Sequence, residues 1–253
     1  MRASKIGLYM VPTTIYEDKD FVVINKPAGL PVHAGGSIKS GETLVDWLIK
    51  KYPEIKKVGD DLTVRPGIVH RLDKETSGVM VAARTQEGFD NLKQLFKSRM
   101  VEKKYLALVR GVINQKSGRI NLPVGTLKSH GVKRTVRKDY GKQMKEAVTE
   151  FRVLEHFPDA TLVEARPKTG RMHQIRAHFA ALHHPIVGDR LYGGNKPSFF
   201  MKGLDKDLPA GLSRQFLHAG SLSFSYPGGR RFVFEASLPE DLKKFLASLR
   251  NSR

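Results

Sequence analysis

The chain has 253 residues, of which 40% are apolar and 27% charged, which is ordinary usage for a globular protein that builds its own core. It contains no cysteine, and this excludes disulfides, cysteine-ligated zinc and thiol catalysis. Forty-four lysines and arginines against 25 acidic residues give a net charge of +19, and such an excess predicts a polyanionic partner, with nucleic acid the first choice.

The first half of the chain mixes strand-like and helical patterns. Short apolar runs predict strands, while apolar residues three and four apart predict helices. Prolines and glycines mark the connecting loops. In chain order, the expected segments are a polar turn at 16–20, a strand at 21–24, a loop over 26–42, a helix over about 43–52, a strand at 78–83, a helix over about 86–100 and a strand at 104–110.

The second half predicts more strands and two hairpins. The expected segments are strands within 119–166, including a hairpin of 148–153 and 161–163 around Asp159, a helix over about 172–182, a hairpin of 217–226 and 231–234, and a final helix after Pro239. Strands and helices do not alternate regularly. The order therefore favours an α+β fold with a mixed, mostly antiparallel β-sheet flanked by helices and loops.

Membrane and secretion signals are weak in this sequence. Its apolar stretches fall short of the roughly 18–20 residues that span a bilayer. The run at residues 6–11 is too short for a signal peptide. We expect a soluble monomer in the cytoplasm that makes no membrane contact.

A basic segment lies between Thr126 and Lys145, with seven lysines and arginines and a single acidic residue, Asp139. Alternation with apolar residues suggests an exposed ribbon. It is either an edge protected against aggregation by its charges or an arm that contacts phosphates. The second interpretation fits a chain of +19 better, and makes RNA-binding candidates of Lys133, Arg134 and Arg137. A second basic group between Lys93 and Lys104 either extends that surface or solvates a helix.

The segment from residue 66 to residue 78 is dense in reactive side chains and lies between two apolar runs. Asp73 and Glu75 together suggest an acid–base pair, although alternation along an extended segment would point them to opposite sides. His70 next to Asp73 suggests a metal site, but no other ligand spacing supports it. From these residues alone, an ion-paired loop and an active site are equally plausible.

A third segment, residues 169–178, has helical spacing in which Arg176 adjoins the apolar positions Met172 and Phe179. An arginine on that face points inward and then needs an anion, for which a carboxylate from another segment is the natural partner. The alternative is a side chain that reaches to the surface.

Several ordered blocks resemble the pseudouridine synthases, in the branch of the ribosomal large-subunit pseudouridine synthases A, C and D. The block His70–Gly78 around Asp73 is the most specific of them. The blocks cover nearly the whole chain and are residues 24–29 with His33, 70–78, 104–109, 170–176, 189–193 and 217–219.

This resemblance implies a role for each matching residue. Asp73 is the catalytic aspartate, Tyr105 stacks on the base, and Arg176 pairs with the catalytic carboxylate. Arg71 enters the space left by the flipped nucleotide, and Leu217 packs near the target uracil. His70 and His173, from the same blocks, join the predicted substrate-binding set. The sequence departs from the family at Met172, where threonine is usual.

The resemblance also implies an isomerase that turns uridine into pseudouridine without a cofactor or a metal. A non-catalytic RNA-binding protein is the alternative of another class, and a two-carboxylate hydrolase is disfavoured by the poor placement of Glu75. We expect ribosomal RNA as the substrate, with transfer RNA second. The family match begins near residue 14, so we expect a catalytic domain over 14–253 and an extension over 1–13, with no ribosomal-protein-like RNA-binding domain seen before it. Either the enzyme works without such a domain, or the chain is a catalytic fragment.

Overall fold

The computed structural model describes residues 11–34, 42–193 and 212–251. They form two compact units. Unit 1 holds the described residues up to Val101 together with Ser221–Ala236, and unit 2 holds those from Glu102 to Gly220 and from Ser237 onward. Each unit has its own cluster of buried apolar side chains.

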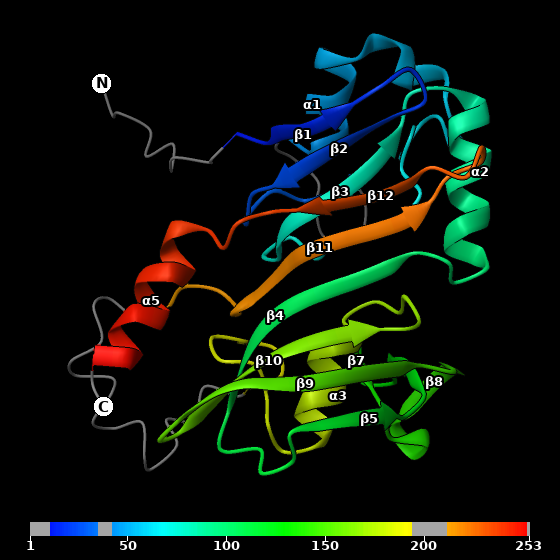
Figure 1. The fold of residues 1–253 in the computed structure, drawn as a ribbon. Coiled ribbons are helices and arrows are strands. Elements are labelled where there is room, and N and C mark those ends of the chain that lie inside the picture. Colours follow the sequence, from blue (N-terminus) through cyan, green and yellow to red (C-terminus); the bar gives the residue numbers. More distant parts are fainter. Residues whose placement is uncertain (1–10, 35–41, 194–211, 252–253) are drawn as a thin grey trace, which may run out of the picture. The chain divides into compact units, whose positions relative to one another are not determined.

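Unit 1 is built on antiparallel strands in the order β1-β2-β3, with a hairpin of β11 and β12 (Figure 1). The strands β2 and β3 are nearly continuous runs of buried residues, which explains their apolar sequence. The elements of this unit are β1 (Thr13–Glu17), β2 (Phe21–Lys26), α1 (Leu44–Lys51), the 3-10 helix η1 (Pro53–Lys57), β3 (Ser77–Ala83), α2 (Gln86–Lys97), β11 (Leu217–Ser225, shared with unit 2) and β12 (Arg231–Glu235).

The predicted polar turn at 16–20 was wrong at its start, because Tyr16 and Glu17 belong to strand β1. The Tyr16 ring packs on an aromatic cluster, with its centroid 5.7 Å from that of Phe21 and 5.3 Å from that of Phe234. That packing outweighs the local polarity. The turn itself is shorter: Asp18 Oδ1 accepts hydrogen bonds from the main-chain N–H groups of Asp20 and Phe21, at 2.8 and 3.0 Å.

Unit 2 contains four antiparallel strands in the order β4-β10-β9-β5, so the hairpin predicted around Asp159 is confirmed as β9 and β10. The helices α3 and α5 contribute Phe179 and Leu246 to its apolar core. The elements are β4 (Glu102–Arg110), β5 (Ser117–Asn121), β9 (Val148–Phe157), β10 (Ala160–Pro167), α3 (Gln174–Ala181) and α5 (Glu240–Asn251).

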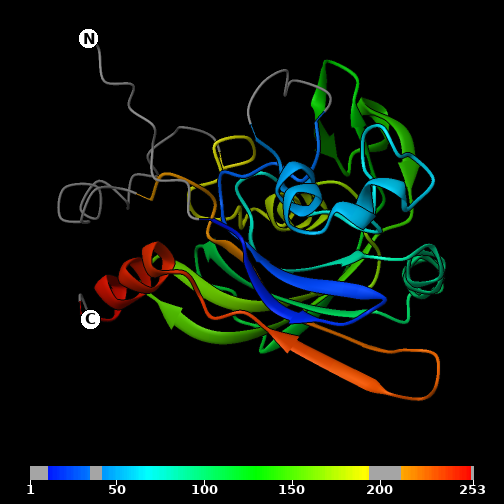
Figure 2. The same ribbon diagram turned by 90° about the horizontal axis from the view of Figure 1, so that it is seen from above.

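The basic segment of unit 2 forms a separate three-stranded sheet, which we call the basic sheet. Its strands are β6 (Val124–Leu127), β7 (His130–Thr135) and β8 (Gly141–Lys145), in the order β7-β6-β8, with the 3-10 helix η2 (Lys138–Tyr140) before β8. Figure 2 shows these green strands apart from β9 and β10.

A buried histidine fixes helix α3 to its neighbours in unit 2. His178 is fully buried, with Nε2 2.9 Å from the carbonyl oxygen of Leu122 and Nδ1 2.9 Å from Oγ1 of Thr149. A carbonyl only accepts, so Nε2 carries the proton. Burial lowers the pKa of His178, and the hydrogen bond to Leu122 opposes that shift. The imidazole is therefore a neutral bridge within the fold.

The α+β prediction is confirmed, because helices accompany a sheet whose described pairs of strands are antiparallel. Among the helices of the described ranges, none is long and apolar enough to cross a membrane.

Candidate active site

Asp73 lies in a turn of unit 1 immediately before strand β3. Its carbonyl oxygen accepts a hydrogen bond from the N–H of Thr76 at 3.0 Å. The next carbonyl, that of Lys74, accepts from the N–H of Gly29 at 2.9 Å. The turn is thus held by its main chain.

A buried lysine reinforces this turn. The Lys26 side chain at the end of β2 is fully buried, and its Nζ donates to the carbonyl oxygens of Pro27 (2.7 Å), Leu30 (2.8 Å) and Lys74 (3.1 Å). A buried ammonium needs such acceptors to replace water. Lys26 therefore ties the loop after β2 to the loop that carries Asp73.

Two further residues of the same block have defined contacts. His70 Nε2 accepts a hydrogen bond from the N–H of Val81 at 3.0 Å, and its ring stacks on Phe96 with centroids 4.5 Å apart. Arg71 is exposed, and its Nη1 lies 3.1 Å from Nε2 of His33. Both residues flank the Asp73 turn. Their predicted contacts with RNA stay predictions.

In unit 2, Tyr105 lies on β4 opposite Ala165 of β10 and packs, partly buried, against the apolar core. Leu217, at the start of β11, is itself in that core. Lys103 is two residues before Tyr105 and so shares its face of the strand. Burial lowers the pKa of Lys103 to about 8. The β4 face that carries Tyr105 therefore also carries an amine that gives up its proton more readily than an exposed lysine does.

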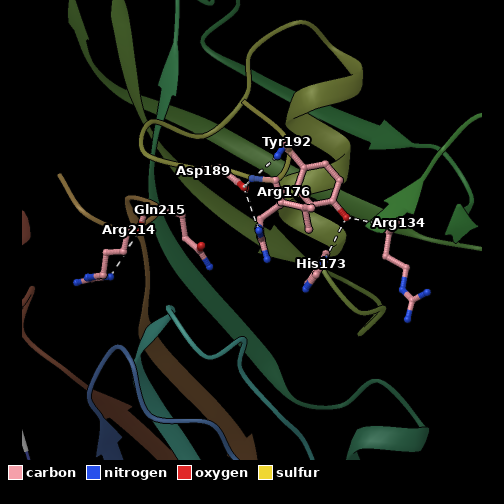
Figure 3. A network of polar contacts seen from close by, with 8 residues as sticks. Arg134, His173, Arg176, Asp189, Tyr192, Arg214 and Gln215 are labelled. Atoms are coloured by element: carbon pink, nitrogen blue, oxygen red, sulfur yellow. Dashed lines mark hydrogen bonds and ion pairs between the residues drawn. The ribbon is translucent and has the colours of Figure 1, made fainter. Parts of the chain in front are cut away.

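Arg176 points inward, as predicted, and its guanidinium binds the carboxylate of Asp189. Both residues are buried, and Nε donates to Oδ2 at 2.7 Å while Nη2 donates to Oδ1 at 2.9 Å (Figure 3). This bidentate geometry is the strongest arrangement for such a pair. The expectation of a carboxylate from another segment is confirmed with Asp189. The predicted pairing with Asp73 stays a prediction.

No role was predicted for Asp189 or Tyr192, although both lie in a block that carried the resemblance. Asp189 Oδ1 also accepts from the N–H groups of Leu191 (3.0 Å) and Tyr192 (3.1 Å), which closes a turn. The Tyr192 ring lies against Arg176, whose Cζ is 5.1 Å from the ring centroid. The sequence signal that could have predicted this turn is an aspartate three residues before an aromatic residue, because aspartate often caps a turn through its side chain.

The helix predicted from Met172 begins two residues later, at Gln174. His173 precedes it in a left-handed conformation, with φ 55°, so the chain has not yet entered the helix. Oε1 of Gln174 accepts from the N–H of Arg171 at 3.0 Å, which stabilises this entry. As a result His173 faces Tyr192, with its Nδ1 3.1 Å from the hydroxyl oxygen.

The three basic-sheet candidates differ in their surroundings. Lys133 Nζ lies 5.5 Å from the centroid of the Tyr192 ring. Arg134 donates from Nη1 to Thr126 and from Nη2 to the sulfur of Met172, the latter at 3.1 Å. Arg137 is exposed, with its Cζ 4.3 Å from the Tyr140 ring centroid. The atypical Met172 thus contacts the basic sheet.

The predicted residues are divided between the units. Asp73, Arg71 and His70 are in unit 1, whereas the remaining candidates, from Tyr105 to Leu217, are in unit 2. Within the part of the chain that the structure describes, no group of three or more histidine or acidic side chains is arranged to hold a metal ion.

Comparison with known proteins gives the same family from sequence and from structure. Residues 20–181 match the family model described as RNA pseudouridylate synthase. The chain is 44% identical over 240 residues to ribosomal large subunit pseudouridine synthase D of Xylella fastidiosa, covering 93% of this chain and 69% of that protein. It is 39% identical over 238 residues to an uncharacterized RNA pseudouridine synthase of Bacillus subtilis, covering 94% and 72%.

Two solved human structures are similar to this one. Human RNA pseudouridylate synthase domain containing 4 matches with a TM-score of 0.73 and 31% identity, covering 94% of this chain and 92% of that one. Human RNA pseudouridylate synthase domain containing 1 matches with a TM-score of 0.71 and 26% identity, covering 96% of both chains.

Proposed function

This chain belongs to the RNA pseudouridylate synthase family, and we propose that it isomerises specific uridines of large-subunit ribosomal RNA with Asp73 as the nucleophile. The enzyme class, an isomerase that acts on RNA, follows from the family. The observation that carries the finer proposal is the 44% identity to a ribosomal large subunit synthase over 240 residues. The block His70–Gly78 around Asp73 lies inside the family match.

The reaction suits a single carboxylate. The bond between ribose carbon 1′ and ring nitrogen 1 breaks, the uracil turns, and carbon 1′ bonds to carbon 5. The hydrogen of carbon 5 then leaves as a proton and nitrogen 1 takes up a proton, so that the product is an isomer of uridine. A carboxylate can form and release the required adduct, either at ribose carbon 1′ or at uracil carbon 6. In our proposal, the firmly held turn of unit 1 presents Asp73 for that attack.

The target uridine must leave its stack, and this costs a few kcal/mol. We assign to Tyr105 the stacking that offsets part of it, since a base on an aromatic ring gains about 1–3 kcal/mol. In the same proposal Arg71 fills the vacated space and Leu217 contacts the uracil. His70 and His173 complete the substrate-binding set. These roles are supported by the family resemblance at each position.

We assign Arg176 as the cation that keeps Asp73 ionised and aimed. A guanidinium has five N–H donors, and its bonds to Asp189 use Nε and Nη2. Asp189 therefore holds Arg176 as a buried and permanently positive group. An adjacent arginine favours the charged form of a carboxylate, which the nucleophile needs.

The basic sheet is proposed to contact RNA phosphates, chiefly through Lys133, Arg134 and Arg137. We expect the double variant Lys133→Ala, Arg137→Ala to bind RNA more weakly and to lower the slope of log affinity against log salt by about 1.5, since each lost phosphate contact removes about 0.7–0.9. Filter binding from 50 to 300 mM salt measures it. The matched control is Lys56→Ala, Lys57→Ala, in η1 of unit 1. An unchanged slope in the basic-sheet variant would contradict the assignment.

The test of the function uses ribosomal and transfer RNA transcripts labelled with tritium at uridine carbon 5. We expect tritium release from large-subunit ribosomal RNA. Release from transfer RNA alone would replace the substrate, and binding without release from either would favour a non-catalytic RNA-binding protein. We further propose that the enzyme is a monomer and that it acts in the cytoplasm, where ribosomal RNA is available to it.

A further inference from the structure

Tyr192 contacts strand β7 and the start of helix α3 in unit 2. Its hydroxyl accepts a hydrogen bond from the N–H of Arg134 in β7 at 2.7 Å, and the same oxygen lies 3.1 Å from Nδ1 of His173. The ring lies against the guanidinium of Arg176, with a distance of 5.1 Å from Cζ to the centroid (Figure 3). One side chain thus touches the basic sheet, the entry to α3 and the buried arginine.

Asp189 places Tyr192 and Arg176 together. Its Oδ1 accepts from the N–H of Tyr192 at 3.1 Å and from Nη2 of Arg176 at 2.9 Å. The carboxylate meets the guanidinium edge, and the guanidinium carbon lies over the tyrosine ring. An arginine held by a carboxylate and an aromatic ring has little freedom to turn, because each contact requires a defined plane.

The surroundings of the ring differ from those of a core aromatic. The Tyr192 side chain is half-buried, and a second cation, Nζ of Lys133, lies 5.5 Å from its centroid. The ring therefore lies near two cations, Arg176 and Lys133, and a cation is attracted to the face of an aromatic ring. Lys133 and Arg134 are adjacent in β7, so the ring and the hydroxyl both contact the same stretch of the basic sheet.

We propose that Tyr192 is a positioning residue that couples the basic sheet to Arg176. This inference rests on the proposed function, in which Arg176 serves the catalytic carboxylate and the basic sheet binds phosphates. The hydroxyl fixes strand β7 and the ring fixes the guanidinium. RNA bound along the basic sheet is then held in register with the arginine by a single side chain.

The direct test compares Tyr192→Phe with Tyr192→Leu, because phenylalanine keeps the ring and loses the hydroxyl, whereas leucine loses both. Two signals are followed by NMR: the Nε–H resonance of Arg176 and the hydrogen exchange of the Arg134 amide. We expect both variants to speed that exchange by about fivefold to tenfold, the effect of one lost hydrogen bond. Only leucine should move the Arg176 resonance, by removing the ring current.

The functional test measures RNA affinity and the single-turnover rate at saturating RNA. We expect Tyr192→Phe to weaken RNA binding about fivefold and to leave the saturating rate within about threefold, whereas Tyr192→Leu lowers the saturating rate by about tenfold or more. Tyr140→Phe is the matched control, since Tyr140 is half exposed in η2 next to β8. It should change neither quantity.

The outcomes separate this inference from the proposed function. An Arg176 resonance unmoved by leucine, or an Arg134 amide unaffected by phenylalanine, would overturn the coupling whether or not the enzyme turns over. Equal losses of rate in the two variants would also overturn it, because they would indicate a general structural role. Wild-type protein that releases no tritium would instead overturn the proposed function and leave the NMR comparison decisive for Tyr192.

Discussion

Replacement of Asp73 by alanine is expected to reduce tritium release by about 10⁴-fold or more while RNA binding stays within about threefold of wild type. A nucleophile has no substitute in the reaction, and removal of one in other enzymes has effects of that order. Binding, by contrast, draws mainly on phosphate contacts. Release is measured under single-turnover conditions with RNA labelled at uridine carbon 5.

The turn should survive this substitution, because the hydrogen bonds that Asp73 and Lys74 accept from Thr76, Gly29 and Lys26 use main-chain oxygens, which alanine retains. The matched control is Glu75→Ala, which removes a carboxylate from the same segment. It should retain activity within about threefold. Full activity of Asp73→Ala would exclude the nucleophile assignment, and inactivity of both variants would point to damage of the loop.

Replacement of Asp189 by alanine is expected to lower the free energy of unfolding by about 3–5 kcal/mol, since it leaves Arg176 as a buried charge without this bidentate partner. Turnover should also fall, because the guanidinium loses its orientation. Urea denaturation measures the first effect and the saturating rate the second.

We expect Arg176→Met to depress turnover far more than RNA affinity. Equal losses of the two would identify Arg176 as a phosphate contact instead.

The double variant Asp189→Ala, Arg176→Met isolates the pair. The double variant keeps neither buried charge, so its loss in free energy of unfolding should be smaller than the sum of the losses in the two single variants. The difference measures the coupling between the two residues. Asp60→Ala is the matched control. Asp60 forms an ion pair with Lys93 at 2.7 Å, but both side chains are about half exposed. Its removal should change the free energy of unfolding by less than about 1 kcal/mol. Strict additivity at Asp189 and Arg176 would contradict a strong pair.

The strands and helices were largely predictable because burial imposes its period on the sequence. Strand β3 is buried at each of its seven positions, and its sequence from Val79 to Ala83 is a continuous apolar run that predicts a buried strand. Tyr16 was misassigned because its strand character comes from aromatic rings far along the chain, which no local pattern reveals. His173 was misassigned because a left-handed residue before a helix has no strong signal in its side chain.

The candidate site was predictable in its residue types more than in its partners. The inward position of Arg176 followed from helical spacing, and the need for an anion followed from burial. Asp189 is only 13 positions further on, yet no periodicity links the two. Tyr192 could not be predicted at all as a contact of β7, because that contact joins a side-chain hydroxyl to a main-chain amide 58 residues away.

The buried ammonium of Lys26 has a consequence for the energetics of the enzyme. Its carbonyl acceptors on Pro27, Leu30 and Lys74 lie in two loops, so the ammonium fixes the main chain of both loops when the chain folds. Fixing the main chain of one residue costs about 1–2 kcal/mol of conformational entropy. The loop of Asp73 is already ordered in the folded protein, so RNA binding does not have to offset this loss of entropy. The free energy gained from RNA contacts therefore remains available for extruding the uridine.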